Sequence, residues 1–389
     1  MISIETLAST LVPTDGVTLL LRAAFLEGQE TSSVLRRWQD QEEDPTQAMA
    51  SPETVSLAPT LFANLQGRPI LEELSPRLVT YLKTALVHEQ LRLTAYRSIL
   101  AEVLHELGHR NVRFLLTGGA LNGETLYPHG LRHSHDIDLL VRPSERTAVE
   151  RALVDAGFAP PRRHDRNHLT LLHAKGLPIS LHESALAFRA YQLDCEDVFA
   201  RAETYEILGH AVEGPGREDR FLQACINGIT SDRRGVLWVG DSMLLARQQG
   251  LDGGKLAMTS QAANCELPVW IALRYLETRL ALAAVRPGVR LTPEIRRLLE
   301  TAAGRSGPSA RETLLQGTWS GHRGSVHQHL KYCASAGEKL LVLKAKVLPS
   351  LRALTGSNRV DGPGDLPRFY WGRAQRLLRR AGAGHPVTR

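Results

Sequence analysis

Residues 112–123 read VRFLLTGGALNG, and residues 131–143 read LRHSHDIDLLVRP. The first stretch is a short apolar run that stops at Gly118-Gly119 and is followed by a helical pattern over 120–127. The second stretch alternates acidic and aliphatic residues from Asp136 to Val141, which predicts a strand. We therefore expect two strands connected by a glycine turn, a helix and a loop, and this unit decides the fold.

The two aspartates of the second stretch, Asp136 and Asp138, point to the same face of a strand because side chains alternate with a period of two. Like charges this close repel one another unless a cation lies between them, which favours a Mg²⁺ site. Gly118 and Gly119 allow backbone N–H groups to approach a phosphate at the start of a helix. Either piece alone is also compatible with a simple turn or with solvent-facing aspartates. Together and in this order, they predict a site for an NTP and its metal.

The segments around this unit divide the chain. Apolar residues recur at helical spacing from Leu78 to Leu107 and predict one long amphipathic helix that ends near Gly108. Further helices are expected over 16–40, 267–287, 293–303 and 325–347, and further strands over 168–173, 178–182 and 205–212. The expected fold class is α+β, a small mixed sheet flanked by N- and C-terminal helical regions. The expected regions are a helical region 1–110, an α/β core 111–215, a helical domain 216–350 and a loop with a basic tail 351–389.

The charge of the chain is concentrated at its end. The 389 residues carry a formal net charge of +6, and residues 367–389 hold six arginines and no acid. Without them, the remaining Lys and Arg equal the 41 acidic residues in number. A nucleic-acid-binding protein usually spreads an excess of positive charge over a folded face, so a nucleic-acid partner is not expected. The tail is expected to be a basic helix, with contact to phosphate, a membrane surface or an acidic partner as the alternative.

Composition and cysteine spacing favour a cytoplasmic protein. The four cysteines, Cys195, Cys225, Cys265 and Cys333, are far apart and form no CxxC pair, which fits a reducing compartment. The first ten residues, MISIETLAST, lack the basic start and apolar run of a secretory signal. No apolar stretch reaches the 18 residues of a transmembrane helix. The sequence does not indicate an oligomeric state.

The motif resembles a known superfamily. LLTGGAL followed by LRHSHDIDLLVRP is similar to the hG[GS]…DhDh signature of the nucleotidyltransferases related to DNA polymerase β. More narrowly, it resembles a bacterial group of uncharacterised nucleotidyltransferase family proteins. The likeness spans about residues 15 to 380 and is most specific over 115–143; outside that part it includes LAPTL at 57–61, NHL at 167–169, WVGD at 238–241 and LPRFYWGRAQRLLRR at 366–380.

The resemblance implies an Mg²⁺-dependent enzyme that binds an NTP, with ATP as the expected nucleotide. Asp136 and Asp138 would be the catalytic metal ligands, and Gly118 and Gly119 would lie beneath the phosphates. An NMP would be transferred to a hydroxyl or phosphate of a small molecule or peptide, with loss of pyrophosphate. Arg132 matches an arginine of the family and is expected either to meet phosphate charge or to pair with Asp136 or Asp138.

The sequence departs from the family pattern at three positions. Thr117 replaces a common lysine before the glycines, and His133 replaces a common proline. The third carboxylate of the superfamily aligns with Ser180, which cannot supply an anionic ligand. Glu183 is near but at an odd offset, so only a bulge or a strand end would bring it to the site. The alternative function is therefore a catalytically impaired scaffold that binds nucleotide or a partner.

Two other features remain open. His182 shares a strand face with Ser180 and is expected either to contact the substrate, to act as a base, or to be a core histidine. A dedicated zinc site is not expected, because the histidines show no metal-ligand spacing. Trp238 and Asp241 lie on a predicted helix, and the simplest reading is a buried tryptophan beside a cap or an ion pair.

Overall fold

The structure is a computed structural model. It describes residues 3–26, 30–163, 168–186, 190–230, 236–248, 251–280, 293–305, 335–356 and 362–372, with isolated positions at 188, 307, 310–311, 314 and 360. Residues 366–372 are helical, but the rest of the predicted basic tail lies outside the described residues. The same holds for 281–287 and 325–334, which belong to two of the predicted helices.

The N-terminal region is helical, as predicted. Its helices are α1 (Ile4–Leu11), α2 (Asp15–Phe25), α3 (Glu30–Gln39), α4 (Pro45–Met49), α5 (Ala58–Leu65), α6 (Ile70–Glu73) and α7 (Pro76–His109). The segment 16–40, predicted as one helical stretch, holds the two helices α2 and α3, which pack against each other. Ser3 and Thr14 cap the first two helices, each accepting a hydrogen bond from a backbone N–H in the first turn.

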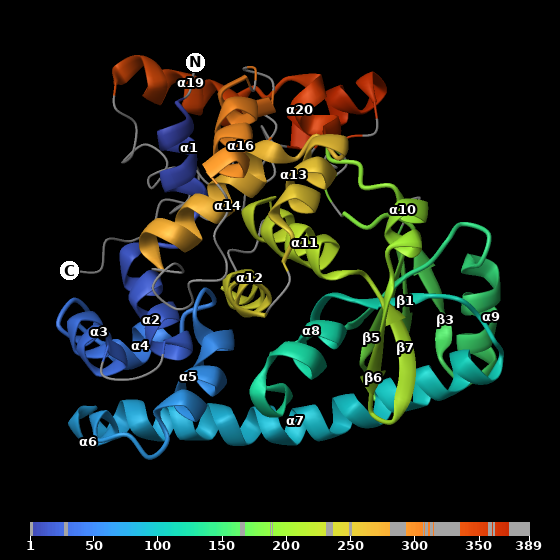
Figure 1. The fold of residues 1–389 in the computed structure, drawn as a ribbon, viewed down its shortest axis with the longest axis horizontal. Helices are drawn as coiled ribbons and strands as arrows, with labels where there is room; N and C mark the ends of the chain where they lie inside the picture. The colour runs from blue at the N-terminus through green and yellow to red at the C-terminus, as the bar shows by residue number, and fades with distance from the viewer. Residues whose placement is uncertain are drawn as a thin grey trace.

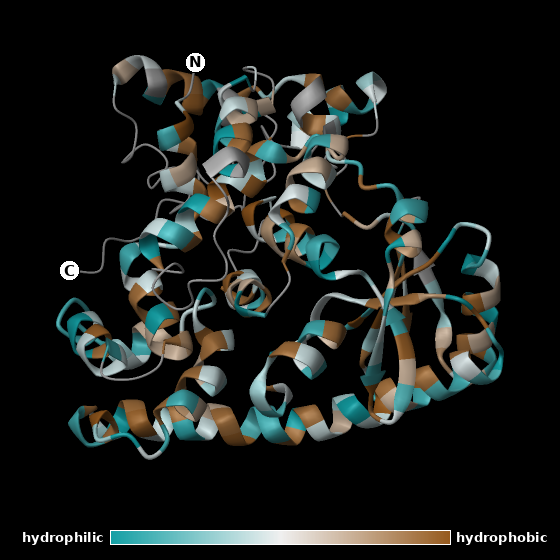
Figure 2. Ribbon diagram, viewed as in Figure 1, coloured by the Kyte–Doolittle hydropathy of each residue, from teal (hydrophilic) through white to brown (hydrophobic). Residues whose placement is uncertain are grey.

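Helix α7 is the long helix that the periodicity predicts, and it joins two hydrophobic cores. Ser75 caps its first turn, and Pro76 occupies the first helical position. Its N-terminal half, with Leu82, packs against the other N-terminal helices, whereas its C-terminal half, with Leu100, packs against the sheet. Figure 1 shows α7 as one rod along the lower edge of the molecule, and Figure 2 shows hydrophobic residues recurring along it. Each fully buried leucine contributes roughly 1.5–3 kcal/mol.

The central sheet has five strands in the order β1-β2-β5-β4-β3. The strands are β1 (Leu115–Thr117), β2 (Ile137–Leu140), β3 (Ala159–Arg163), β4 (His168–Leu172) and β5 (Pro178–His182). Only β2 and β5 are parallel; the other neighbours are antiparallel, so the sheet is mixed. Helix α8 (Gly118–Leu126) follows β1, and α9 (Arg146–Asp155) follows β2. The expected α+β fold class with a small mixed sheet is confirmed.

A second, two-stranded sheet corrects one prediction. The segment 205–212, predicted as a single strand, contributes to β6 (Glu203–Ile207) and β7 (His210–Gly214), which form a hairpin. The turn at Leu208-Gly209 has positive φ at both residues, which is the backbone of a tight two-residue hairpin turn. Helix α10 (Cys195–Ala200) precedes this hairpin.

The C-terminal region is again helical, with α11 (Arg217–Thr230), α12 (Leu237–Arg247), α13 (Gly253–Ala262), α14 (Glu266–Arg279), α16 (Pro293–Arg305), α19 (Ala336–Val347) and α20 (Leu351–Gly356). Helices from both ends of the chain share one core: α12 contacts α2, and α14 contacts α1. The hydroxyls of Thr18 and Tyr275 lie 2.9 Å apart within it. Helix α8 contacts β1 and β2 of the sheet and also contacts α11 and α12, so it lies between the sheet and these two helices (Figure 1). Among the described helices, none is both long and apolar enough to span a bilayer.

Candidate active site

The two glycines follow β1 directly and are the first residues of α8, so they lie at the predicted change from strand to helix. Gly118 has a φ of +59°, and a Cβ there would overlap Oδ2 of Asp138. A Cβ at Gly119 would overlap the hydroxyl of Ser134 and the guanidinium of Arg132. Helix α8 begins at Gly118, and Thr117 makes no side-chain cap, so the first N–H groups of α8 have no capping side chain. The two glycines thus bring the start of a helix directly against the aspartate strand.

Asp136 and Asp138 lie beside this turn. Asp138 is paired in register with Thr117 of β1 and with Ser180 of β5, and Asp136 immediately precedes β2. Burial and, after it, the nearby charge of Asp138 together raise the pKa of Asp136 to about 6. Two mutually repelling carboxylates with hard oxygen atoms are a donor set that fits Mg²⁺, which commonly takes one or two carboxylates together with phosphate and water.

Strand β5 supplies one hydrogen-bond partner for each aspartate. The hydroxyl of Ser180 donates to Oδ2 of Asp136 at 3.1 Å, and Nε2 of His182 lies 2.9 Å from Oδ1 of Asp138. The ring of His182 is stacked on that of His168, with centroids 4.6 Å apart. His182 is thus neither a core histidine nor remote from the site. It contacts the carboxylate of Asp138 and lines the same cavity.

A third carboxylate is not brought to the site from β5. Ser180 is 3% exposed and faces Asp136 at the predicted position. Glu183 follows the last residue of β5 and is ion-paired with Arg146 of α9. Strand β5 does end at His182, but Glu183 beyond this strand end pairs with Arg146 and makes no contact with Asp136 that the structure shows. Within the described residues, no group of three or more His, Cys, Asp or Glu is arranged to hold a metal ion.

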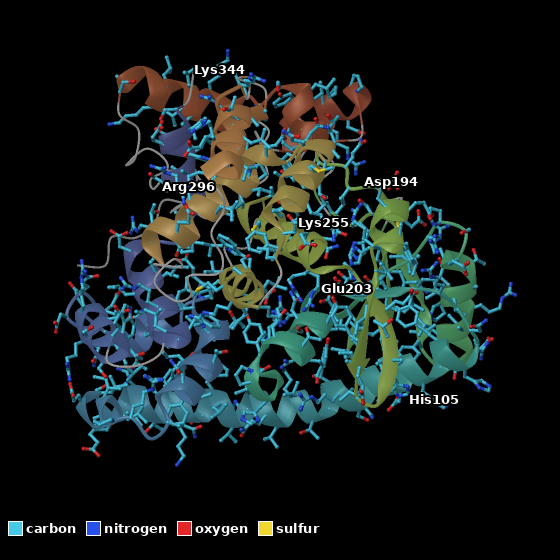
Figure 3. The ribbon with its side chains drawn as sticks, viewed as in Figure 1. His105, Asp194, Glu203, Lys255, Arg296 and Lys344 are labelled. Atoms are coloured by element: carbon cyan, nitrogen blue, oxygen red, sulfur yellow. The ribbon has the colours of Figure 1, made fainter. Side chains whose placement is uncertain are left out.

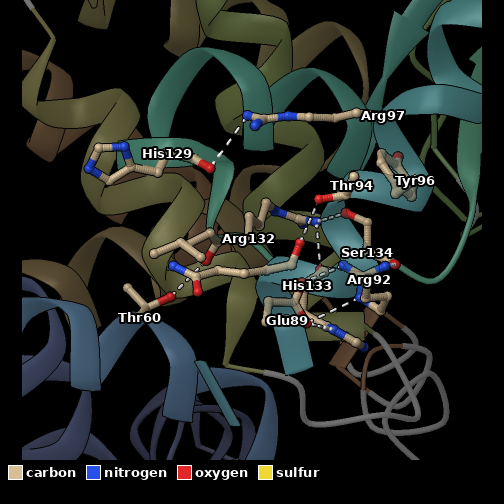
Figure 4. A network of polar contacts seen from close by, with 12 residues as sticks. Thr60, Glu89, Arg92, Thr94, Tyr96, Arg97, His129, Arg132, His133 and Ser134 are labelled. Atoms are coloured by element: carbon tan, nitrogen blue, oxygen red, sulfur yellow. Dashed lines mark hydrogen bonds and ion pairs between the residues drawn. The ribbon is translucent and has the colours of Figure 1, made fainter. Parts of the chain in front are cut away.

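The loop that leads into the aspartate strand is held by two N-terminal helices (Figure 4). Helix α7 makes three of these contacts: Arg92 Nη1 donates to the carbonyl of Ser134 at 2.6 Å, Tyr96 donates to the carbonyl of Asp136 at 3.0 Å, and Glu89 lies 2.7 Å from Nδ1 of His133. Thr60 of α5 donates to the carbonyl of Leu131 at 2.8 Å. The backbone on both sides of the first aspartate is therefore fixed by α7.

Glu89 is the acidic anchor of this loop. Burial on its own would raise its pKa, but hydrogen bonds from His133 and Arg92 outweigh burial and lower the pKa to about 2. The carboxylate is therefore ionised under all ordinary conditions. His133, which occupies a position where proline is common in the resembling group, thus has a structural partner.

Arg132 pairs with Asp241, which the sequence analysis did not foresee. Its Nε and Nη2 each lie 2.7 Å from one carboxylate oxygen of Asp241 on α12, a bidentate ion pair. Burial alone would lower the pKa of Arg132, but the Asp241 carboxylate raises it above its ordinary value. Of the two alternatives given for Arg132, the pairing with Asp136 or Asp138 is wrong, because Asp241 takes this role. The ion pair foreseen for Asp241 is confirmed.

Asp241 is in turn the centre of a buried polar cluster. It accepts hydrogen bonds from the hydroxyl of Tyr127 at 2.9 Å and from Nδ2 of Asn122 at 3.0 Å. The oxygen of the same Asn122 amide accepts from Nε and Nη2 of Arg220 on α11. This cluster joins α8 and the loop before β2 to the two C-terminal helices that face the site. Asn122 and Arg220 were not singled out from the sequence.

A cavity of about 270 Å³ opens between the sheet and the C-terminal helices. On the sheet side it is lined by Gly118, Asp138 and His182, and on the opposite side by residues of α11 and α12 that include Arg220 and Trp238. The cavity is therefore the space in front of the glycine turn and the second aspartate. The predicted phosphate and metal residues and the C-terminal helices face one another across it.

A mixed sheet in which a glycine turn abuts two aspartates on the neighbouring strand defines a nucleotidyltransferase-like core. The sequence model of the uncharacterised nucleotidyltransferase family matches residues 41–281, more than half of the chain, so the chain belongs to that family. The match includes α7, the sheet, the cavity and α11 to α14. Comparison with curated proteins gives no match.

Proposed function

We propose that this protein is a Mg²⁺-dependent nucleotidyltransferase that moves an NMP from an NTP, with ATP as the expected donor, to a hydroxyl or phosphate of a small molecule or peptide. The proposal rests chiefly on one observation: a glycine turn with positive φ places an uncapped helix start against Asp138, at the edge of a cavity. Such a helix start attracts phosphate, and the aspartates attract its counterion.

In this proposal, each residue at the site has a defined task. Asp136 and Asp138 hold Mg²⁺, and the N–H groups at Gly118 and Gly119 bind phosphate oxygens. When bound, Mg²⁺ neutralises phosphate charge and lowers the pKa of an attacking hydroxyl. His182 keeps one oxygen of Asp138 in place through its 2.9 Å contact, which leaves the other oxygen to the metal. Arg132, held by Asp241, positions the loop rather than binding phosphate.

The alternative is a nucleotide- or partner-binding scaffold with little turnover. It is favoured by the contact of Ser180 with Asp136, because a hydroxyl occupies the place where a third anionic ligand would help to activate the nucleophile. Both functions use the same nucleotide site. They differ in pyrophosphate release, which only the transferase predicts.

The site assignment is tested by calorimetry with each of the four Mg-NTPs. We expect binding by the wild-type protein and a loss of at least about 10-fold in affinity for Asp136→Ala and Asp138→Ala, because a metal-bridged phosphate contact is removed. Asp155→Ala is the matched control, since Asp155 is ion-paired with Arg110 on the surface, on α9 and away from the cavity. Equal affinity in all four proteins, or no binding by any of them, would refute the assignment.

A further inference from the structure

The first turn of α11 carries three consecutive buried charges. Glu218, Asp219 and Arg220 are 4%, 1% and 4% exposed. A carboxylate oxygen of Glu218 lies 2.8 Å from Nζ of Lys255, a residue of α13 that Figure 3 labels. A carboxylate oxygen of Asp219 lies 3.0 Å from Nη2 of Arg201. Both acids thus have a basic partner of their own. Neither is available to neutralise Arg220.

The described side chains that Arg220 is hydrogen-bonded to or stacked on are all neutral. Its Nε and Nη2 donate to Oδ1 of Asn122 at 3.0 and 2.8 Å, and Nη2 donates to the hydroxyl of Thr125 at 2.5 Å. Its guanidinium lies over the ring of Tyr205, 5.1 Å from the centroid. Among the described residues, no carboxylate is within ion-pair distance of Arg220. Burial lowers its pKa, yet an arginine stays protonated in proteins.

Asp241, the carboxylate on the same wall of the cavity as Arg220, is already paired with Arg132. Asn122 bridges Asp241 to Arg220, and both oxygens of Asp241 are bound by Arg132. Burial lowers the pKa of Arg220 by more than the charges of Asp241 and Glu203 raise it. Arg132, Asp241 and Arg220 therefore leave one positive charge in excess on this wall. A buried charge without a partner is costly, and a fold retains such a group where a ligand supplies the missing charge.

Arg220 is also next to the glycine turn. One turn further along α11, Gln223 accepts a hydrogen bond from the hydroxyl of Thr117 at 3.1 Å, and Thr117 is the last residue before the glycines. Thr117, Arg220 and Gln223 all line the 270 Å³ cavity. The turn itself, Thr117-Gly118-Gly119, carries no charge. A cation for a ligand at this turn has to come from another element, and α11 presents one.

We propose that Arg220 binds the polyphosphate of the nucleotide in this cavity and supplies the positive charge that the glycine turn lacks. The guanidinium fork suits the oxygens of a phosphate chain, and a dry wall strengthens the contact. The identification of the anion as a nucleotide polyphosphate rests on the proposed function. The observation of an excess positive charge on the cavity wall does not depend on the proposed function.

The test uses calorimetry with inorganic tripolyphosphate, Mg-ATP and adenosine on the full chain. We expect Arg220→Gln to weaken tripolyphosphate and Mg-ATP by about 10-fold to about 150-fold, the range for a hydrogen bond to a charged group, while the response to adenosine stays unchanged. Arg201→Gln is the control, because it leaves Asp219 unpaired on the same turn but does not touch the cavity.

A second variant separates ligand binding from folding. Thr117→Lys added to Arg220→Gln restores a cation at the turn, so polyphosphate affinity should recover at least in part, whereas a loss caused by misfolding of Arg220→Gln would not be reversed by the added Thr117→Lys. Equal polyphosphate affinity in Arg220→Gln and wild type, or no polyphosphate binding by wild type, would overturn the inference. Polyphosphate binding that depends on Arg220, without pyrophosphate release from any NTP, would uphold the inference and contradict the transferase.

Discussion

The hydroxyl of Ser180 donates a hydrogen bond to Oδ2 of Asp136 at 3.1 Å, from the strand next to the aspartate strand. This contact stabilises the ionised form of Asp136 and lowers its pKa, against the larger effects of burial and of Asp138. A neutral donor thus occupies the position from which a third carboxylate would share the metal. Under the proposed function, this contact is what separates an active transferase from a scaffold with little turnover.

Replacing Ser180 with aspartate should raise turnover. Ser180→Asp puts a third carboxylate beside Asp136, which favours a second cation and the activation of a nucleophile. We expect pyrophosphate release from Mg-NTP to rise by on the order of 10-fold or more, and the metal-free protein to lose stability because three carboxylates repel. Ser184→Asp is the control, since Ser184 also lines the cavity but bonds the carbonyl of Leu186. Unchanged turnover in Ser180→Asp would show that the third ligand is not what limits the site.

Breaking the Arg132–Asp241 pair should destabilise the fold. Asp241→Asn leaves a buried guanidinium without its counterion, and we expect the free energy of unfolding to fall by about 3–5 kcal/mol. Glu213→Gln breaks the Arg113–Glu213 pair, whose side chains are 46% and 37% exposed, and should cost less than about 1 kcal/mol. Urea denaturation measures both. Similar losses in the two variants would contradict a buried structural role for Asp241.

A methyl group at Gly118 should damage the site beyond its backbone cost. Gly118→Ala strains a residue with positive φ by about 1–2 kcal/mol and also displaces Asp138. Gly67→Ala carries a similar strain, at a φ of +75°, with nothing within 4 Å of the added atom. We expect only Gly118→Ala to reduce nucleotide turnover, by on the order of 100-fold, because a small displacement misaligns a reacting group. Steady-state kinetics with a melting curve for each variant separates the two effects.

The stability of the protein at low pH should depend on Glu89. Its pKa is about 2 in the fold and 4.5 ordinarily, so the carboxylate contributes stability that is complete above about pH 5 and is lost as pH falls toward 2. The shift corresponds to about 3 kcal/mol. Urea denaturation between pH 7 and pH 2 should therefore show the difference between wild type and Glu89→Gln shrinking over that window. Parallel stability curves would contradict the anchor role of Glu89.

Local patterns in the sequence predicted the centre of the site, but they could not predict hydrogen bonds between residues that are far apart in the chain. Gly118-Gly119 and Asp136 with Asp138 each lie within three residues, so strand and turn periodicity identifies them. Asn122 is hydrogen-bonded to Arg220, 98 positions away in the sequence, and to Asp241, 119 positions away. The periodicity of side chains along a strand or helix gives no information about such contacts. In the sequence, Arg220 is one of four consecutive charged residues, 217–220, and nothing there distinguishes it as buried.

Strand β3 and the hairpin of β6 and β7 show the same limit. Strand β3 was not predicted, because its sequence APPRR has two prolines and no apolar alternation; it pairs only with β4, at the edge of the sheet, where proline is tolerated. The hairpin of β6 and β7 was read as one strand because Leu208, an apolar residue, occupies its turn. In both cases the local amino-acid composition gave the wrong prediction, because pairing with a neighbouring strand determines the structure of these segments.

The central claim is that Asp136 and Asp138 hold a divalent cation together with a nucleotide. It is tested most directly by electron paramagnetic resonance of Mn²⁺ titrated into the protein with each NTP in turn. The account predicts one or more Mn²⁺ ions bound by wild type only when the preferred nucleotide is present, and none by Asp138→Asn. Equal nucleotide-dependent binding of Mn²⁺ in wild type and Asp138→Asn would contradict it.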